Sequence, residues 1–248
     1  MSDHAECSDH AVAARLATEA GRLLLGVREE LADATEADRK AAGDKRSHEY
    51  LMDALARERP HDAVLSEEGV DDPVRLNSER VWIVDPLDGT REFSELGRHD
   101  WAVHVALWQS GQLVAGAVAL PAQGVTLATP DPAPPPAHTG APRIVVSRTR
   151  PPAVALQVRD QLNGTLVEMG SAGAKVAAVI QGLADVYVHA GGQYEWDSAA
   201  PVAVARAAGL HTSRIDGSPL EYNRADPLLP DLVVCRPEYA DAVLAVTG

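Results

Sequence analysis

The sequence predicts a chain that folds as two halves of different class, an α+β half followed by an α/β half. Before residue 129, two helical patterns come ahead of a run of strand patterns, an order typical of α+β units. After residue 142, strand and helix patterns alternate, which is typical of α/β units. The stretch between them, TPDPAPPPAHTGAP at 129–142, is too rich in proline for a helix or a central strand. We therefore expect an N-terminal domain over 1–141 and a C-terminal domain over 142–248.

The first half is expected to begin with two helices and to continue with strands. Apolar residues between 12 and 31 recur near a 3.6-residue period and predict an amphipathic helix. Residues 33–44 are polar and lack this period, so we expect a loop there, before helical spacing resumes at 47–59 and Pro60 stops it. The strand patterns lie at 63–65, 81–84 and 125–128, with a hairpin formed by 101–108 and 113–120.

The second half has a βαβα-like order of patterns. The strands are expected at 143–147, 165–169, 185–189 and 231–235. The helices are expected at 152–162, 172–180 and 197–208, with a short helix after Pro237. Gly182 and Gly209 follow two of these helices, as glycine often does just beyond a helix C-terminus.

Composition limits the classes of partner. The chain has 248 residues and a formal net charge of −14, which argues against nonspecific binding to nucleic acid or to an anionic membrane. Its two cysteines, Cys7 and Cys235, are too few for a disulfide framework and form no CxxC pair, so we expect a cytoplasmic protein. The N-terminus lacks a signal-peptide pattern, and no apolar run reaches the roughly 20 residues of a membrane helix. Such an acidic protein would repel a phosphorylated substrate unless a bound cation reversed the local charge.

The segment WIVDPLDGT, residues 82–90, carries the strongest chemical signal. A strand pattern ends there in two carboxylates, Asp85 and Asp88, which repel each other unless a cation lies between them. Mg²⁺ prefers oxygen ligands of this kind. The backbone N–H groups of Gly89 and Thr90 would point out of a helix start, where phosphate binds readily. The alternative is an ordinary β-turn followed by a helix cap, because Asp and Gly are frequent turn residues.

Three more acidic residues lie at the ends of expected elements. Glu67 follows the strand at 63–65, Asp44 precedes the helix at 47–59, and Asp197 begins the helix in WDSAA. Each has a structural alternative, a solvated corner for Glu67 and a helix N-cap for the two aspartates. No single position decides between the two interpretations, but their shared placement at element ends favours a metal site.

Two motifs together point to a known family. WIVDPLDGTREF, followed far downstream by YEWDSAAP, resembles the signatures of the Mg²⁺-dependent, lithium-sensitive inositol monophosphatase superfamily, and LSEE resembles its first glutamate segment. LSEE, DPLDGTREF and GSAGAK are most similar to the branch of CysQ-type 3′(2′),5′-bisphosphate nucleotidases. The resemblance implies a layered αβαβα sandwich of the inositol monophosphatase and fructose-1,6-bisphosphatase type. It also implies an antiparallel sheet in the first half and a homodimer.

The resemblance implies a role for each matching metal ligand. Glu67, Asp85 and the carbonyl of Leu87 would bind a first Mg²⁺. Asp85 would bridge to a second Mg²⁺, which Asp88 and Asp197 would also hold. Two Mg²⁺ ions are therefore expected in each subunit. Two metals close together can acidify a water molecule and neutralise both the attacking and the leaving oxygen of a phosphate ester.

The resemblance also implies catalytic and phosphate-binding roles. Gly89 and Thr90 would hold the scissile phosphate, and the attacking water would lie near Glu67 and Thr90. Asp44 would orient Thr90 and help to hold a third Mg²⁺. The stretch DATEADRKAAG before Asp44 departs from the family pattern of Lys-x-Asp-x-x-Thr-x-x-Asp, so this third ion rests on Asp44 alone.

The residues expected on the substrate side carry positive charge or hydroxyl groups. Arg91 could bind a second phosphate, and Ser147 and Arg148 follow a strand, where they could contact a phosphate or a base. Ser171 and Lys175 lie one helical turn apart, so both could face the cleft, although an exposed helix lysine is the alternative. His104 and His189 lie on strand patterns and are interpreted as structural.

The resemblance implies hydrolysis of the 3′-phosphate of 3′-phosphoadenosine 5′-phosphate to AMP and phosphate, within sulfate assimilation. The sulfated form, 3′-phosphoadenylyl sulfate, is a further candidate substrate. Two alternatives remain at this point. One is the inositol monophosphatase or fructose-1,6-bisphosphatase activity of the same superfamily, and the other is a noncatalytic protein with a relic metal site.

Overall fold

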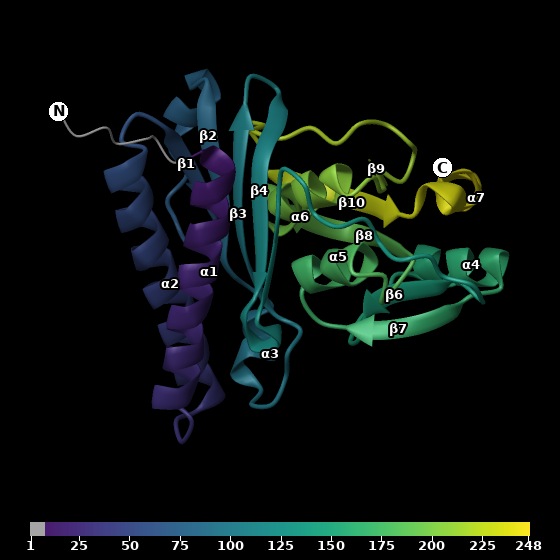
Figure 1. Cartoon of the computed structure of the whole chain (residues 1–248), viewed down its shortest axis with the longest axis horizontal. Helices are drawn as coiled ribbons and strands as arrows, with labels where there is room; N and C mark the ends of the chain where they lie inside the picture. The colour runs from purple at the N-terminus through teal and green to yellow at the C-terminus, as the bar shows by residue number, and fades with distance from the viewer. Residues whose placement is uncertain (1–7) are drawn as a thin grey trace.

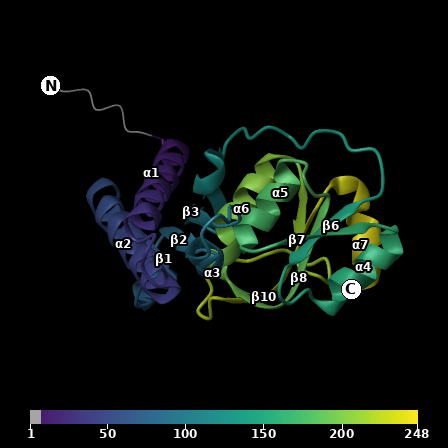
Figure 2. The same ribbon diagram turned by 90° about the horizontal axis from the view of Figure 1, so that it is seen from below.

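The computed structural model describes residues 8–248 and arranges them in five layers (Figure 1). The outer layer on the first sheet consists of α1 (Asp9–Glu30) and α2 (Glu36–Glu58). The layer between the two sheets consists of α5 (Ala172–Ile180) and α6 (Glu195–Ala207). Figure 2 shows the outer layer on the second sheet, made of α4 (Ala153–Leu162) and α7 (Ala240–Thr247). This order confirms the predicted αβαβα sandwich.

The first sheet has the strand order β1-β2-β3-β4-β5. Its strands are β1 (Ala63–Ser66), β2 (Arg80–Asp88), β3 (Ala102–Gln109), β4 (Gln112–Leu120) and β5 (Val125–Ala128). The predicted hairpin is confirmed as β3 and β4, joined by Ser110 and Gly111, both at positive φ as a two-residue hairpin turn requires. The expectation of an antiparallel sheet is wrong at one edge, because β1 pairs with β2 in parallel. The connection between these two strands includes a 3₁₀-helix, η1 (Pro73–Asn77), and another 3₁₀-helix, η2 (Pro121–Gln123), follows β4.

The second sheet has the strand order β7-β6-β8-β10-β9. Its strands are β6 (Arg143–Ser147), β7 (Thr165–Met169), β8 (Val186–Tyr194), β9 (His211–Ser213) and β10 (Leu228–Cys235), with the 3₁₀-helix η3 (Pro237–Tyr239) before α7. β6 pairs in parallel with β7 and β8, whereas β10 runs antiparallel to both of its neighbours. The three-residue strand β9 was not predicted. The two sheets take their strands from either side of 129–142, and we retain the division into 1–141 and 142–248 as a proposal.

The loop predicted at 33–44 is wrong, because α2 already begins at Glu36. Thr35 is the N-cap of this helix, and its side chain accepts a hydrogen bond from the backbone of the first turn. The side chain of Arg39 is buried, and its Nε donates to the carbonyl of Ser94 at 2.9 Å. The first turns of α2 are held by this buried arginine and not by apolar side chains. The hydrophobic period in the sequence therefore did not reveal them.

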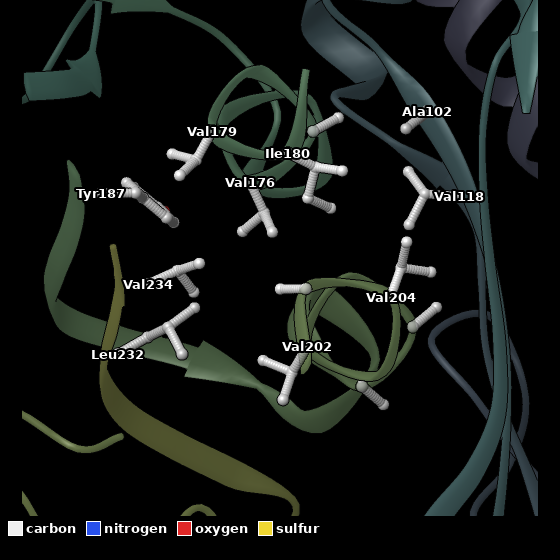
Figure 3. Packing of buried hydrophobic residues seen from close by; sticks show 14 of the residues in the cluster. Ala102, Val118, Val176, Val179, Ile180, Tyr187, Val202, Val204, Leu232 and Val234 are labelled. Atoms are coloured by element: carbon white, nitrogen blue, oxygen red, sulfur yellow. The ribbon is translucent and has the colours of Figure 1, made fainter. Parts of the chain in front are cut away.

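The core between the two sheets consists largely of small aliphatic side chains (Figure 3). Val118 of β4 lies against Val204 of α6, and Val234 of β10 lies on the other side of the helical layer. α6 packs closely on β4, since a Cβ added at Gly116 would lie only 2.6 Å from the Cβ of Ala203. This close packing fixes the start of α6 relative to the first sheet, where the acidic motifs lie.

The structure bears on only some of the expectations about the cysteines and the N-terminus. The N-terminal segment with Cys7 is outside them. Cys235 is buried in β10 and has no disulfide partner within 8–248. Over the same residues, no helix combines the length and the apolar character that a membrane span requires.

Candidate active site

The two aspartates of the DPLDGT segment lie at a bulge of β2. The strand expected at 81–84 is longer than predicted, because β2 spans Arg80–Asp88. Its register with β3 shifts between Asp85 and Asp88, so Pro86 falls within the irregularity and not in a regular ladder. Gly89 then adopts a φ of +82°, a conformation that favours glycine, and the short helix α3 (Thr90–Ser94) begins at Thr90.

Asp197 reaches the same place from the second half of the chain. α6 begins at Glu195, so Asp197 lies in the first turn, and the N-cap interpretation of this residue is wrong. Its Oδ2 accepts a hydrogen bond from the backbone N–H of Tyr194 at 2.6 Å, as in a capping box. Oxygen atoms of Asp85, Asp88 and Asp197 all lie within 4.8 Å of one another.

The carboxylates around Asp85 carry uncompensated charge. Asp85 is buried, and desolvation followed by the charges of Glu67, Asp88 and Asp197 raises its pKa well above the usual range. Burial, and then the charge of Asp88, raises the pKa of Asp197 to about 6. Although Glu67 is an exposed residue, desolvation of its carboxyl group and the charges of Asp197 and Asp88 raise its pKa to about 7. A divalent cation would remove this repulsion, so the donor set fits a metal with oxygen ligands.

Asp88 differs from Asp85 because donors surround its carboxylate. Its Oδ2 accepts from the hydroxyl of Ser171 and, at 2.6 Å, from the N–H of Gly173, while Oδ1 accepts from the N–H of Ala172 at 3.1 Å. These donors belong to the start of α5, so a carboxylate of the first sheet caps a helix of the middle layer. Burial would raise the pKa of Asp88, but the hydrogen bonds and charge of His104 and the α5 donors lower it to about 2.

Thr90 and Asp44 lie together at the start of α3. The Thr90 hydroxyl is 3.3 Å from Asp44 Oδ1 and 3.1 Å from the carbonyl oxygen of Leu87. Asp44 lies in the middle of α2 and not before a helix, so both its predicted position and its N-cap alternative are wrong. Burial, followed by the charge of Glu68, raises the pKa of Asp44 to about 6.

Ser171 and Lys175 do lie beside this cluster, but both support it from α5. Ser171 is the N-cap of the helix and donates to Asp88. Lys175 is buried, so the alternative of an exposed lysine is wrong, and its Nζ donates to the carbonyls of Gly170 at 3.2 Å and Ser171 at 2.5 Å. Burial lowers the pKa of Lys175 in spite of the carboxylates around it.

The remaining substrate-side residues lie at the junction of β6 and α3. Arg148 Nε donates to Glu92 Oε1 at 2.7 Å, and Arg148 Nη2 donates to Glu95 Oε1 at 2.6 Å. Arg91 is exposed and its Nε contacts the same Glu95 oxygen at 3.3 Å. Ser147 is half-buried at the end of β6. The structure therefore places Arg148 and Arg91 next to the DPLDGT corner, joined through one glutamate.

His104 is the site residue that the sequence interpretation missed. It lies on β3, it is fully buried, and its Nε2 is 3.2 Å from Asp88 Oδ2. Its Nδ1 is 3.0 Å from the carbonyl oxygen of Trp196. Burial lowers the pKa of His104, but the hydrogen bond and charge of Asp88 raise it by more. A histidine within the buried strand AVHVALW was a signal, because such a polar ring needs partners. His189 lies on β8, where its Nε2 is 3.3 Å from the carbonyl oxygen of Gly192.

Comparisons with known proteins identify the family and agree with the fold. The sequence profile of the inositol monophosphatase family matches residues 6–131 and 139–246. A Mycobacterium leprae protein named 3′-phosphoadenosine 5′-phosphate phosphatase is 52% identical over 255 residues, covering 98% of this chain and 94% of that protein. A Mycobacterium tuberculosis protein of the same name is 54% identical over 235 residues, covering 91% of this chain and 88% of that protein. The crystal structure of CysQ from Bacteroides thetaiotaomicron is similar with a TM-score of 0.76 at 29% identity, covering 91% of this chain and 96% of that chain.

Proposed function

Since this chain belongs to the inositol monophosphatase family, we propose that it is a metal-dependent 3′(2′),5′-bisphosphate nucleotidase. Its substrate would be 3′-phosphoadenosine 5′-phosphate, which it would hydrolyse to AMP and phosphate. The observation that carries the proposal is the cluster of Asp85, Asp88 and Asp197 beside the start of α3. The two relatives at 52% and 54% identity, which carry the name of this activity, support the choice of substrate.

The carboxylates would hold two Mg²⁺ ions. Glu67, Asp85 and the Leu87 carbonyl would bind the first ion, and Asp85, Asp88 and Asp197 would bind the second. The raised pKa values of Asp85 and Asp197 support this assignment, because burial and the neighbouring carboxylates outweigh the groups that favour their ionised forms. When bound, the ions would acidify a water molecule and neutralise charge on the phosphate oxygens. A third ion near Asp44 is part of the same proposal.

The residues around α3 would bind the phosphate and move the proton. The N–H groups of Gly89 and Thr90 would hold the phosphate at the start of the helix, with water on the side of Glu67 and Thr90. As the water oxygen bonds to phosphorus and the bond from phosphorus to O3′ breaks, Thr90 Oγ1 would accept the water proton and pass its own to Asp44. Burial favours the protonated form of Asp44, which makes it a better proton acceptor. The O3′ leaving group takes a proton from solvent.

The second phosphate of the substrate would lie on the side of α3 that carries the arginines. Arg91 is exposed, and both Arg91 and Arg148 could exchange their contact with Glu95 for a phosphate oxygen. Ser147 would add a hydroxyl at the end of β6. Ser171 and Lys175 would act mainly through the backbone and carboxylate that they hold, since their polar atoms already have protein partners.

An assay of phosphate release tests the proposal. Purified protein with Mg²⁺ would be given 3′-phosphoadenosine 5′-phosphate, inositol 1-phosphate or fructose 1,6-bisphosphate, each with and without Li⁺ and with EDTA. We expect the nucleotide to be preferred, and its turnover to be lost with EDTA and suppressed by Li⁺. Preference for a sugar or inositol phosphate would overturn the substrate, and no release from any of them would overturn the enzyme.

The wider biological setting is also part of the proposal. We propose a cytoplasmic homodimer that removes a by-product of sulfate assimilation, with 3′-phosphoadenylyl sulfate as a further substrate. Light scattering after size-exclusion chromatography tests the oligomeric state. Release of phosphate from the sulfated nucleotide, followed by chromatography of the product, tests the second substrate.

A further inference from the structure

We infer that His104 is a positioning residue of this site, which fixes the carboxylate of Asp88 to the first turn of α6. The inference rests on the proposed function, because it assigns His104 a role in holding a metal ligand. No motif of the family resemblance includes this position. Three independent contacts of the imidazole ring carry the inference.

The first two contacts connect elements that are far apart in the chain. His104 Nδ1 lies 3.0 Å from the carbonyl oxygen of Trp196, and because a carbonyl only accepts, Nδ1 must carry a hydrogen. The other ring nitrogen, Nε2, then lies 3.2 Å from Asp88 Oδ2. A single fully buried ring thus spans from Asp88 on β2 to the residue just before Asp197 on α6.

The third observation is that the ring of His104 occupies the space beside Gly173, where any other residue would have a side chain. A Cβ at position 173 would lie 1.9 Å from His104 Nε2 and 2.7 Å from Cε1, so any side chain there would displace the imidazole. The N–H of Gly173 itself donates to Asp88 Oδ2 at 2.6 Å. The start of α5, the ring of His104 and the carboxylate of Asp88 therefore form one packed unit.

This unit determines which oxygen of Asp88 stays available. Ser171, Gly173 and His104 all lie on Oδ2, whereas Ala172 N is the described donor on Oδ1, at 3.1 Å. A carboxylate oxygen has room for a cation besides one long hydrogen bond. His104 would hold Asp88 in the orientation that leaves Oδ1 for the metal shared with Asp85 and Asp197. Loss of an outer partner of a metal ligand typically costs about 10–100-fold in affinity or activity.

Variants of the ring and of its space test this role. His104→Phe keeps the aromatic volume and removes both nitrogens, and Gly173→Ala keeps the imidazole in the chain but closes its space. Val105→Ala is the matched control, since Val105 is a buried neighbour on β3 that packs in the core beneath the outer helices. His104→Gln restores a donor and serves as the conservative variant. Mg²⁺ affinity is measured by calorimetry, and kcat and KM are measured with the nucleotide.

We expect His104→Phe and Gly173→Ala to weaken Mg²⁺ binding and to lower kcat by about 10–100-fold, with little change in KM. Val105→Ala should keep the Mg²⁺ affinity although it lowers the melting temperature. His104→Gln should recover part of the Mg²⁺ affinity that His104→Phe loses. Wild-type Mg²⁺ affinity in a folded His104→Phe variant would overturn the inference. If His104→Phe does not fold, unchanged Mg²⁺ affinity in Gly173→Ala would overturn it equally. Failure of the wild type to hydrolyse any substrate would reject the proposed function, while the calorimetry would still report on His104.

Discussion

Asp85 and Asp88 lie three residues apart on one strand, yet their surroundings differ sharply. Asp85 accepts one backbone hydrogen bond, from Leu87 N at 3.0 Å, and faces other carboxylates. Asp88 accepts from a hydroxyl and two backbone N–H groups and lies against His104. The pKa of Asp85 is therefore raised well above its usual range, whereas that of Asp88 is lowered to about 2.

The two aspartates of one motif therefore have different structural roles. Around Asp85, the fold crowds carboxyl groups that bind protons tightly unless an added cation balances their charge. Around Asp88, the same fold supplies the balancing dipoles from α5, so this carboxylate also stabilises the contact between the two halves.

The largest effect is expected where the two aspartates act alike. Replacement of either residue, by Asp85→Asn or Asp88→Asn, removes a charged metal ligand and should lower kcat/KM for the nucleotide by more than about 100-fold. Steady-state kinetics across a Mg²⁺ titration would measure this. Asp160→Asn, on the exposed face of α4, is the control and should be unchanged. An active Asp85→Asn enzyme would reject the metal assignment.

The next largest effect is expected from Thr90 and Asp44, which are proposed to take the proton from the attacking water. Thr90→Ala and Asp44→Asn should each lower kcat by about 100-fold, because proton transfer by a positioned group contributes about 10²–10⁴. Thr90→Ser, which keeps the hydroxyl, should retain most of the activity. Single-turnover measurements would isolate the chemical step. If Thr90→Ala alone reduced the rate, Asp44 would have no part in the proton transfer.

A smaller effect separates the two aspartates in stability. In EDTA at pH 7, Asp85→Asn should raise the free energy of unfolding, because it removes a buried carboxyl group whose ionisation the neighbouring carboxylates oppose. Asp88→Asn should lower it by about 1–3 kcal/mol, since charge-assisted hydrogen bonds to α5 are lost. Urea unfolding monitored by circular dichroism would measure both. Shifts of the same sign in the two variants would contradict the contrast.

The smallest effect is a pH dependence that follows from the same pKa values. Carboxylates with raised pKa, such as Glu67 at about 7 and Asp197 at about 6, bind protons more tightly in the folded state. The stability that these groups contribute to the folded state is fully present below their unfolded pKa of about 4. It is lost as the pH rises through 6 to 7. The metal-free protein should therefore melt a few degrees higher at pH 5 than at pH 8. Below pH 4 the trend should reverse, because Asp88, with its pKa of about 2, loses its hydrogen-bonded charge.

Scanning calorimetry in EDTA across pH 2–8 would test this prediction. Addition of Mg²⁺ at pH 8 should raise the melting temperature, because a bound ion stabilises the folded state. The Asp85→Asn variant should show a flatter curve between pH 5 and pH 8. A melting temperature that rises steadily from pH 5 to pH 8 in EDTA would contradict the raised pKa values.

Several features of this protein could be predicted from the sequence because they depend on local patterns. The apolar period at 12–31 is confirmed as α1, the hairpin at 101–120 as β3 and β4, and the DPLDGT and WDSAAP segments as parts of one acidic cluster. Each of these signals lies within a few neighbouring residues. The family resemblance then supplied the αβαβα order, which local patterns alone do not encode.

The tertiary structure decided the features that depend on partners far away in the chain. The start of α2 is held by Arg39 reaching Ser94, the state of Asp88 by donors from α5, and the position of His104 by Gly173 and Trp196. No window of the sequence contains both members of these pairs. The sequence alone therefore determined which residues could bind a metal, whereas the packing of α5 and α6 on the first sheet decided which carboxylates are left needing one, because charge is balanced by neighbours in space.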